Sequence, residues 1–283
     1  MCSLPAASAL KAGFPDSHIT WVVDGRFQDV VRCCSAVDEV VVRDKSRPLL
    51  AVPGEYRLAL DLQGLRLSGL VVARSKAKAK VGYHWQREGS ALFSRRVIPD
   101  PTSIHVVDQY VDVARAVGGL ADRADFALVP EPESVVRIRD RVPDRFVVIN
   151  PGSARASKRW PTERFAELID GLTLPTVLIG SPGETGAEEV FALCSRKPIN
   201  LSGQTSVLEL IALISLAQAH VGGDTGSSHI AAALGVPAVG LYSATRPERS
   251  CPYGQIDRCH YDPDGMTRIK SADVLLTLTE AIP

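Results

Sequence analysis

Short apolar, β-branched runs alternate with amphipathic stretches along most of the chain. Helical spacing of apolar residues occurs at 4–13, 162–172, 184–195, 206–218 and 227–235. The runs predicted to be strands are 18–24, 37–43, 57–62, 80–83, 146–152, 175–181, 219–224 and 237–243. Short strands that alternate with helices are typical of parallel sheets covered by helices on both faces. The pattern therefore predicts an α/β protein.

A stretch rich in proline and charge, residues 127–146, interrupts this alternation. We interpret it as a linker with a short helix between two α/β domains, residues 1–135 and 136–283. A length of 283 residues allows one large domain or two ordinary ones. Because ligands of open α/β sheets bind beyond the carboxyl ends of the strands, functional residues are expected in the turns that follow strands.

The composition argues against several classes of protein. Lys plus Arg and Asp plus Glu are both 32, so no net charge draws the chain to nucleic acid. The cysteines form no C-x-x-C pair and no zinc-like spacing with histidine, which favours buried thiols in a reducing cytosol. We find no signal-peptide pattern and no apolar run long enough to span a bilayer, while a peripheral membrane contact stays open.

The first turn with candidate chemistry lies in the stretch Asn150–Leu168. A strand is predicted to end at Pro151-Gly152, and a helix start is predicted at Pro161-Thr162. Hydrogen-bond donors for an anion crowd the loop between them: Ser153, Arg155, Ser157, Lys158 and Arg159. Such a loop beside a helix N-terminus could cradle a phosphate, and a solvated basic loop is the alternative.

The second turn, in the stretch Ile179–Val190, places Glu184 in the first turn of a predicted helix. Its carboxylate could accept hydrogen bonds from a ribose diol. The alternative is a residue that only complements the helix dipole.

The third turn opens the stretch Gly222–Tyr242. Asp224 is predicted to end a strand, and Thr225-Gly226-Ser227-Ser228 would present hydroxyls and backbone N–H groups at a helix N-terminus, with His229 close by. The alternatives are an N-terminal cap for Asp224 and a capping or core histidine for His229. So many polar groups exceed what capping requires, and we favour a functional site.

Together the three turns outline a site for a nucleoside diphosphate. No G-x-G-x-x-G or G-x-x-x-x-G-K-[ST] pattern is present, which weakens hydride-transfer and P-loop interpretations. No histidine cluster suggests a metal, and we expect no metal and no cofactor.

The motifs NPGS…SKRWP.ERFAEL and GGDTGSSHIAAALGVP…GLY..T.P resemble those of glycosyltransferase family 9, the heptosyltransferases of lipopolysaccharide inner-core synthesis. DLQGLRLSGL resembles the D-x-Q-G segment of that family, and the likeness covers nearly the whole chain. It implies a GT-B fold, in which two Rossmann-like domains with parallel sheets face each other across a cleft. The N-terminal domain would bind the acceptor and the C-terminal domain the nucleotide sugar.

The resemblance also implies an inverting, metal-independent transfer. The donor would be ADP-L-glycero-D-manno-heptose, and the acceptor Kdo-lipid A or a core that already bears heptose. The enzyme would be a cytoplasmic monomer, or one in peripheral contact with the inner membrane, that works on a lipid-linked acceptor and no nucleic acid.

The site residues carried over by motif match the three turns. Lys158 would bind the donor phosphates and polarise the leaving group, and Asp224 would bind the heptose hydroxyls. The other contacts would be Ser153 with the phosphates, Glu184 with the adenosine ribose, Thr205 with the adenine, and Thr225, Gly226 and His229 with the diphosphate. In the locally basic first half, Arg66 is a candidate contact for an acidic group of the acceptor, and a solvated basic face is the alternative.

The general base is the departure from the family pattern. In the family an aspartate follows the first strand, just before the first helix, whereas here only Met1-Cys2-Ser3 precede the predicted helix. A central strand and its aspartate are therefore expected to be missing, and we assign the base to none of Asp16, Asp24 or Asp61. Either the native start lies upstream, which we favour, or the product is truncated and inactive. We expect weak ADP binding and little transfer from the chain as it stands.

Three other functions remain open. A family 9 relative could use another sugar, and a nucleotide-sugar 2-epimerase would share the nucleotide cradle but favour UDP over ADP. A non-catalytic nucleotide-binding relative would bind ADP without turnover.

Overall fold

The computed structural model describes residues 1–43, 52–152 and 158–282. The chain divides into two compact units, Met1–Leu128 and Val129–Pro283. In the first unit the strands are β1 (Thr20–Asp24), β2 (Glu39–Arg43), β3 (Glu55–Asp61), β4 (Lys76–Gly82) and β5 (Arg95–Arg96). Its helices are α1 (Leu4–Gly13), α2 (Gln28–Arg32), α3 (Arg66–Arg74) and α4 (Val106–Arg115).

The second unit begins with the helix that the proline-rich stretch predicted. The strands of this unit are β6 (Val147–Asn150), β7 (Thr176–Leu178), β8 (Ile199–Asn200), β9 (Ala219–Gly222), β10 (Ala238–Tyr242) and β11 (Cys259–Tyr261). Its helices are α5 (Pro132–Arg139), α6 (Thr162–Gly171), α7 (Gly186–Leu193), α8 (Val207–Leu216), α9 (Gly226–Ala233) and α10 (Ser271–Ala281).

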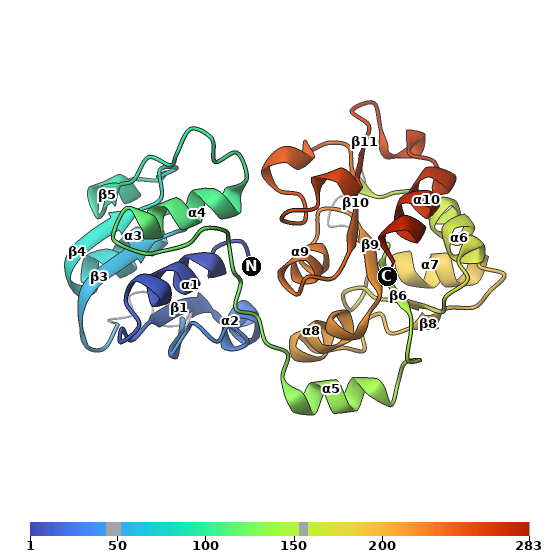
Figure 1. The fold of residues 1–283 in the computed structure, drawn as a ribbon, viewed down its shortest axis with the longest axis horizontal. Coiled ribbons are helices and arrows are strands. Elements are labelled where there is room, and N and C mark those ends of the chain that lie inside the picture. The colour runs from blue at the N-terminus through green and yellow to red at the C-terminus, as the bar shows by residue number, and fades with distance from the viewer. Residues whose placement is uncertain (44–51, 153–157, 283) are drawn as a thin grey trace. The chain divides into compact units, whose positions relative to one another are not determined.

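The second unit is built on one six-stranded sheet of parallel strands in the order β11-β10-β9-β6-β7-β8. Helices α6, α7 and α10 pack on one face, and α8 and α9 lie on the other (Figure 1). The apolar residues of β6, β9 and β10 are buried because both faces are covered. The predicted α/β class with parallel sheets is confirmed.

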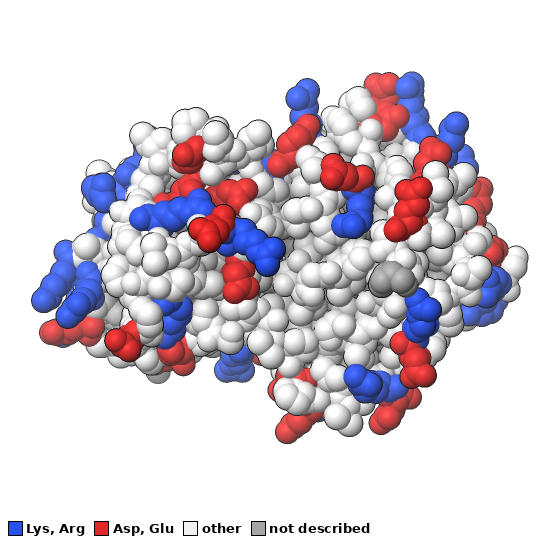
Figure 2. Space-filling model, viewed as in Figure 1, with Lys and Arg blue, Asp and Glu red and all other residues white. Residues whose placement is uncertain are grey.

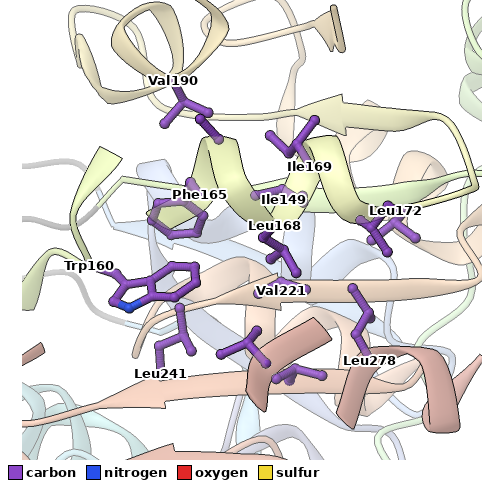
Figure 3. Packing of buried hydrophobic residues seen from close by; sticks show 14 of the residues in the cluster. Ile149, Trp160, Phe165, Leu168, Ile169, Leu172, Val190, Val221, Leu241 and Leu278 are labelled. Carbon is purple, nitrogen blue, oxygen red and sulfur yellow. The ribbon is translucent and has the colours of Figure 1, made fainter. Parts of the chain in front are cut away.

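The core of this sheet is closed at one end by Trp160, which stands just before α6. Its ring meets Phe165 edge to face at 4.8 Å between centroids, and its indole N–H donates to the carbonyl of Ile269 at 3.0 Å. Figure 3 shows Trp160 and Phe165 beside Leu168 and Leu241. The aromatic residue thereby ties the end of the loop after β6 to the segment that leads into α10.

The sheet of the first unit is in two pieces. β1 pairs with β2, and β3 pairs with β4 and β4 with β5, all parallel, but no ladder joins β1 to β3 in the part of the chain that the structure describes. A cavity of about 1840 Å³ opens between them, lined by Trp21 and Val23 of β1, by Leu58 and Leu60 of β3, and by α1. At one end the Tyr56 hydroxyl reaches Thr20 Oγ1 at 3.4 Å.

The second sheet shows what such a gap means. There β6 lies between β7 and β9, whereas in the first unit β1 and β3 line a cavity together with residues of α1. The half-exposed apolar residues of β1 contrast with the fully buried ones of β6 and β9. Among the described residues no strand lies between β1 and β3, and the expected loss of a central strand stays a prediction.

Some element limits differ from the predicted ones. β4 begins at Lys76 rather than residue 80, because its pairing with β3 extends back to Lys76 opposite Glu55. The sequence pattern predicts neither α3, which is short, nor α4, which has a polar face. Both helices are present in the structure. In the described residues no helix combines the length and the apolar character needed to cross a membrane.

Candidate functional site

The candidate site lies at the carboxyl ends of neighbouring parallel strands of the second unit. Asn150 at the end of β6 is in register with Gly222 at the end of β9. The turns that follow these strands therefore emerge side by side, as expected for a ligand site of an α/β sheet. They bring together Lys158, from the loop after β6, and the turn that leads from Gly222 into α9.

An ionic cluster centres on Asp224. Lys158 Nζ lies 3.1 Å from Asp224 Oδ2 and donates to Thr245 Oγ1 at 3.4 Å, and His229 Nε2 lies 3.6 Å from Asp224 Oδ1. The hydrogen bond with His229, followed by that with Lys158, holds the pKa of Asp224 below its usual value. Asp224 is therefore an anion at neutral pH, with cationic and imidazole groups on both sides.

Two expectations about Asp224 are corrected. β9 ends at Gly222, so Asp224 lies in the turn and does not end the strand. Thr225 is the N-cap residue of α9, so the capping interpretation of Asp224 is wrong: its carboxylate binds side chains from two segments. An ammonium group has three donors, and Lys158 retains capacity for a further anionic oxygen.

The hydroxyls at the N-terminus of α9 do not all face outward as predicted. Ser228 Oγ is buried and donates to the carbonyl of Gly223 at 2.7 Å, and Ser227 Oγ is buried in a separate polar network. Thr225 is half-buried and Gly226 is exposed, with open space where a Cβ of Gly226 would lie. The surface that an anion could approach therefore consists of Thr225, Gly226 and the backbone N–H groups of the first turn.

The buried network contains two residues that the sequence pattern does not predict. Asn150 Nδ2 donates to Ser227 Oγ at 2.8 Å, and His220 Nε2 lies 3.0 Å from the same oxygen. Thr225 Oγ1 is also 3.0 Å from Ser227 Oγ. Burial, and then the charge of His229, lower the pKa of His220 to about 3, so its ring is neutral. A polar residue inside an otherwise apolar central strand is the one sequence signal for His220.

Glu184 lies at the neighbouring edge of the site. α7 begins at Gly186, so Glu184 precedes the helix and its predicted place in the first turn is wrong. The helix-dipole role stays an alternative interpretation. Its carboxylate accepts from the backbone N–H of Ser181 at 3.2 Å and stands over Gly152, where any Cβ would collide with it. The fold therefore brings this carboxylate beside the end of β6. The ribose contact stays a prediction.

Thr205 is half-buried in the turn before α8. The N–H of Gly203 donates to the carbonyl of Gly180 at 2.9 Å, which joins this turn to the one that holds Glu184. An adenine contact for Thr205 stays a prediction. Ser153, Arg155 and Ser157 lie outside the described residues.

The remaining candidates belong to the first unit. Arg66 begins α3 and is exposed, and its backbone N–H donates to Glu88 Oε2 at 3.3 Å. Asp24 binds the side chain of Arg26 at 2.9 Å, and Asp61 Oδ1 accepts the N–H of Gly64 at 2.9 Å. These engagements give no reason to assign a general base to either aspartate. Within the described ranges, no cluster of three or more His, Cys, Asp or Glu residues could hold a metal ion.

The family model of glycosyltransferase family 9 (heptosyltransferase) matches residues 51–270. The chain belongs to glycosyltransferase family 9. This family 9 glycosyltransferase is 31% identical over 279 residues to the lipopolysaccharide core heptosyltransferase OpsX of Haemophilus influenzae, with 90% of this chain and 78% of the relative covered. It is 26% identical over 275 residues to lipopolysaccharide heptosyltransferase 3 of Escherichia coli K12, with 87% and 79% covered.

Solved structures of other glycosyltransferases have the same fold as this chain. A family 9 glycosyltransferase of Veillonella parvula aligns with a TM-score of 0.85 at 21% identity, covering 99% of this chain and 92% of the other. ADP-heptose lipopolysaccharide heptosyltransferase II of E. coli aligns with a TM-score of 0.82 at 20% identity, covering 99% and 94%. The resemblance seen in the motifs is confirmed, as is the GT-B fold.

Proposed function

We propose that this transferase moves heptose from ADP-L-glycero-D-manno-heptose to the inner core of lipopolysaccharide, with inversion at the anomeric carbon. Support comes from relatives named as lipopolysaccharide heptosyltransferases. The acceptor would be Kdo-lipid A or a heptose-bearing core at the cytoplasmic surface of the inner membrane. The observation that carries the proposal is the cluster of Lys158, Asp224 and His229 beside the open N-terminus of α9.

The reaction breaks the bond between the anomeric carbon and the diphosphate, while an acceptor hydroxyl attacks from the opposite face. Negative charge grows on the leaving diphosphate, and donors already aimed at it lower the barrier. Lys158 would supply an ammonium, and Thr225 with Gly226 a hydroxyl and backbone N–H groups. The proton of the acceptor hydroxyl must be taken up by a general base. We assign this role to none of the described residues. The charge compensation needs no metal ion.

Asp224 has two tasks in this scheme. Without a donor it holds Lys158 in place through the contact at 3.1 Å. When a diphosphate takes over Lys158, the carboxylate becomes available to accept hydrogen bonds from sugar hydroxyls. His229, 3.6 Å from the other carboxylate oxygen, keeps Asp224 oriented during the exchange. Glu184 and Thr205 would hold the ribose and the adenine on the adjacent turns.

The test is nucleotide binding by calorimetry, followed by a transfer assay, with Lys158→Gln. We expect at least a tenfold loss of ADP affinity and a loss of about a hundredfold in any measurable transfer, the usual effect of removing one preorganised donor. Lys197→Gln is the matched control, because Lys197 lies in the same unit and contacts only the end of α7 by its side chain among the described contacts.

Other outcomes would redirect the proposal. Tighter binding of UDP than of ADP would favour an epimerase or another sugar donor. Binding of ADP without transfer, even by a longer chain that completes the first sheet, would make the protein a non-catalytic nucleotide-binding relative. Unchanged ADP affinity in Lys158→Gln would overturn the site itself.

A further inference from the structure

His220 is buried in the middle strand of the second sheet, beneath the turn that opens α9. It is fully buried, and its Nε2 lies 3.0 Å from Ser227 Oγ. Its Nδ1 has no hydrogen-bond partner among the described residues. Burying a polar ring costs free energy that a valine at this position would not. A histidine here therefore needs a reason other than packing.

The position of the proton on the His220 ring decides which atoms of the network donate and which accept hydrogen bonds. A neutral imidazole carries one N–H. If the proton were on Nδ1, a buried N–H would have no acceptor, which is rarer and more costly than an acceptor without a donor. With the proton on Nε2, the ring donates to Ser227 Oγ, and Nδ1 is only an unused acceptor.

This tautomer fixes the hydrogen-bond directions of the neighbouring Ser227 and Thr225 hydroxyls. Ser227 Oγ then accepts from His220 and from Asn150 Nδ2, at 3.0 and 2.8 Å. Its own hydrogen must go to the remaining neighbour, Thr225 Oγ1, at 3.0 Å. The hydrogen of Thr225 is thereby excluded from the inner side. Among the described residues, the acceptor left to it is Ser228 Oγ, at the long distance of 3.4 Å.

We infer that His220 is a positioning residue of the anion site: through Ser227 it orients the Thr225 hydroxyl as a hydrogen-bond donor toward a bound diphosphate. The inference rests on the proposed function, since Thr225 is taken to face the diphosphate. It needs no change of protonation during the reaction. Replacing the ring by an apolar side chain would free Ser227 to accept from Thr225, and the donor would turn inward.

The first measurement is the tautomer in the wild-type protein. Long-range ¹H–¹⁵N spectra of protein labelled at histidine nitrogen should show His220 protonated at Nε2. A ring protonated at Nδ1 would overturn the inference without any variant having to fold.

The second measurement is a double-mutant cycle on ligand affinity, with ADP and inorganic pyrophosphate as probes. His220→Leu should weaken both by about tenfold, the effect of one hydrogen bond to a charged group. In a Thr225→Val background the same change should have less than about a twofold further effect, because the hydroxyl it orients is gone. His220→Gln, whose amide can donate to Ser227, should recover most of the affinity.

The matched control is His260→Leu. His260 makes a contact of the same kind, from Nε2 to Thr277 Oγ1 at 3.0 Å, between β11 and α10. Its loss should lower Tm and leave both affinities unchanged. Effects of His220→Leu and Thr225→Val that simply multiply would make His220 structural and overturn the inference.

The probes separate this inference from the proposed function. Binding of pyrophosphate but not of ADP by the wild type would contradict the nucleotide proposal and leave the positioning role to be decided by the cycle. Binding of ADP with no effect of His220→Leu would support the nucleotide proposal and overturn the positioning role. Binding of neither probe would overturn both.

Discussion

His220 and Asp224 show how burial decides whether an ionisable side chain is charged. His220 is shut away from water, which favours its neutral form and lowers its pKa to about 3. Asp224, four residues later, remains partly open and keeps its charge, because His229 and Lys158 hold its pKa down. The same turn therefore contains a neutral orienting group beneath the surface and an ionic group at the surface.

The neutral state of His220 predicts how stability depends on pH. In the unfolded chain its pKa is near 6.5, and in the folded chain it is about 3. Between these values the unfolded state binds one more proton, so the free energy of unfolding falls as pH falls, by about 1.4 kcal/mol per pH unit from this residue. Above about pH 7 both states are neutral and the contribution is constant.

Urea denaturation of the wild type and of His220→Gln between about pH 7 and about pH 4.5 measures this slope. The variant should lose less stability over that range than the wild type. Equal slopes for the two proteins would show that His220 titrates in the folded state as it does in the unfolded one.

Glu184 makes a second prediction at the residue scale. Its proposed partner is a ribose, so Glu184→Gln should weaken ADP binding by about tenfold, while pyrophosphate, which has no ribose, should bind as before. Glu188→Gln is the control, because Glu188 is an exposed carboxylate on α7. Equal losses for both ligands would place Glu184 in the phosphate site or in the stability of the turn. Calorimetric titration of each variant gives the answer.

At the scale of elements, the two sheets differ in what covers their central strands. In the second unit β6 and β9 are hydrogen-bonded on both edges and buried. In the first unit β1 and β3 each face the cavity with one edge, and their apolar side chains are half-exposed. An open strand edge lacks the pairing that protects backbone amides.

Hydrogen exchange tests this difference. We expect the amides of β1 and β3 that face the cavity to exchange at least about a hundredfold faster than those of β6 and β9, since opening them breaks no ladder hydrogen bond. Peptide-resolved mass spectrometry at neutral pH would measure the rates. Comparable protection in both sheets would mean that the cavity is closed in solution. If a chain extended upstream of Met1 filled it, both protection and transfer rate should rise.

At the scale of the whole molecule, charge is dispersed. Lys and Arg side chains mix with Asp and Glu over the face of each unit seen in Figure 2, in keeping with a formal net charge of zero. Recognition of an anionic donor must therefore depend on local donors such as Lys158 and the N-terminus of α9. Long-range attraction contributes little.

Metal removal should consequently leave donor binding unchanged. We expect ADP affinity in excess EDTA to stay within about twofold of the value in magnesium, because the proposed donors neutralise the diphosphate themselves. Titration of ADP into the protein under both conditions is the measurement. A large gain of affinity on adding magnesium would contradict the metal-independent scheme.

The apolar periodicity and the turn motifs by themselves determined the class, the limits of α1, and the family. These depend on neighbours in sequence: the spacing that buries one face of Leu4–Gly13, and the polar turns of Asn150–Leu168 and Gly222–Tyr242. The comparisons with known proteins confirm the family and the GT-B fold. The roles of Lys158, Asp224 and the other site residues stay predictions.

Only the tertiary structure decided which polar groups meet. Asn150 and His220 lie far apart in sequence and touch the same Ser227 hydroxyl because β6 and β9 are adjacent and in register. Ser227 and Ser228 look like ligand-facing hydroxyls in sequence, and packing of α9 on the sheet turns them inward. The pairing of β1 with β2 and of β3 with β4 likewise depends on long-range contacts that no local pattern encodes.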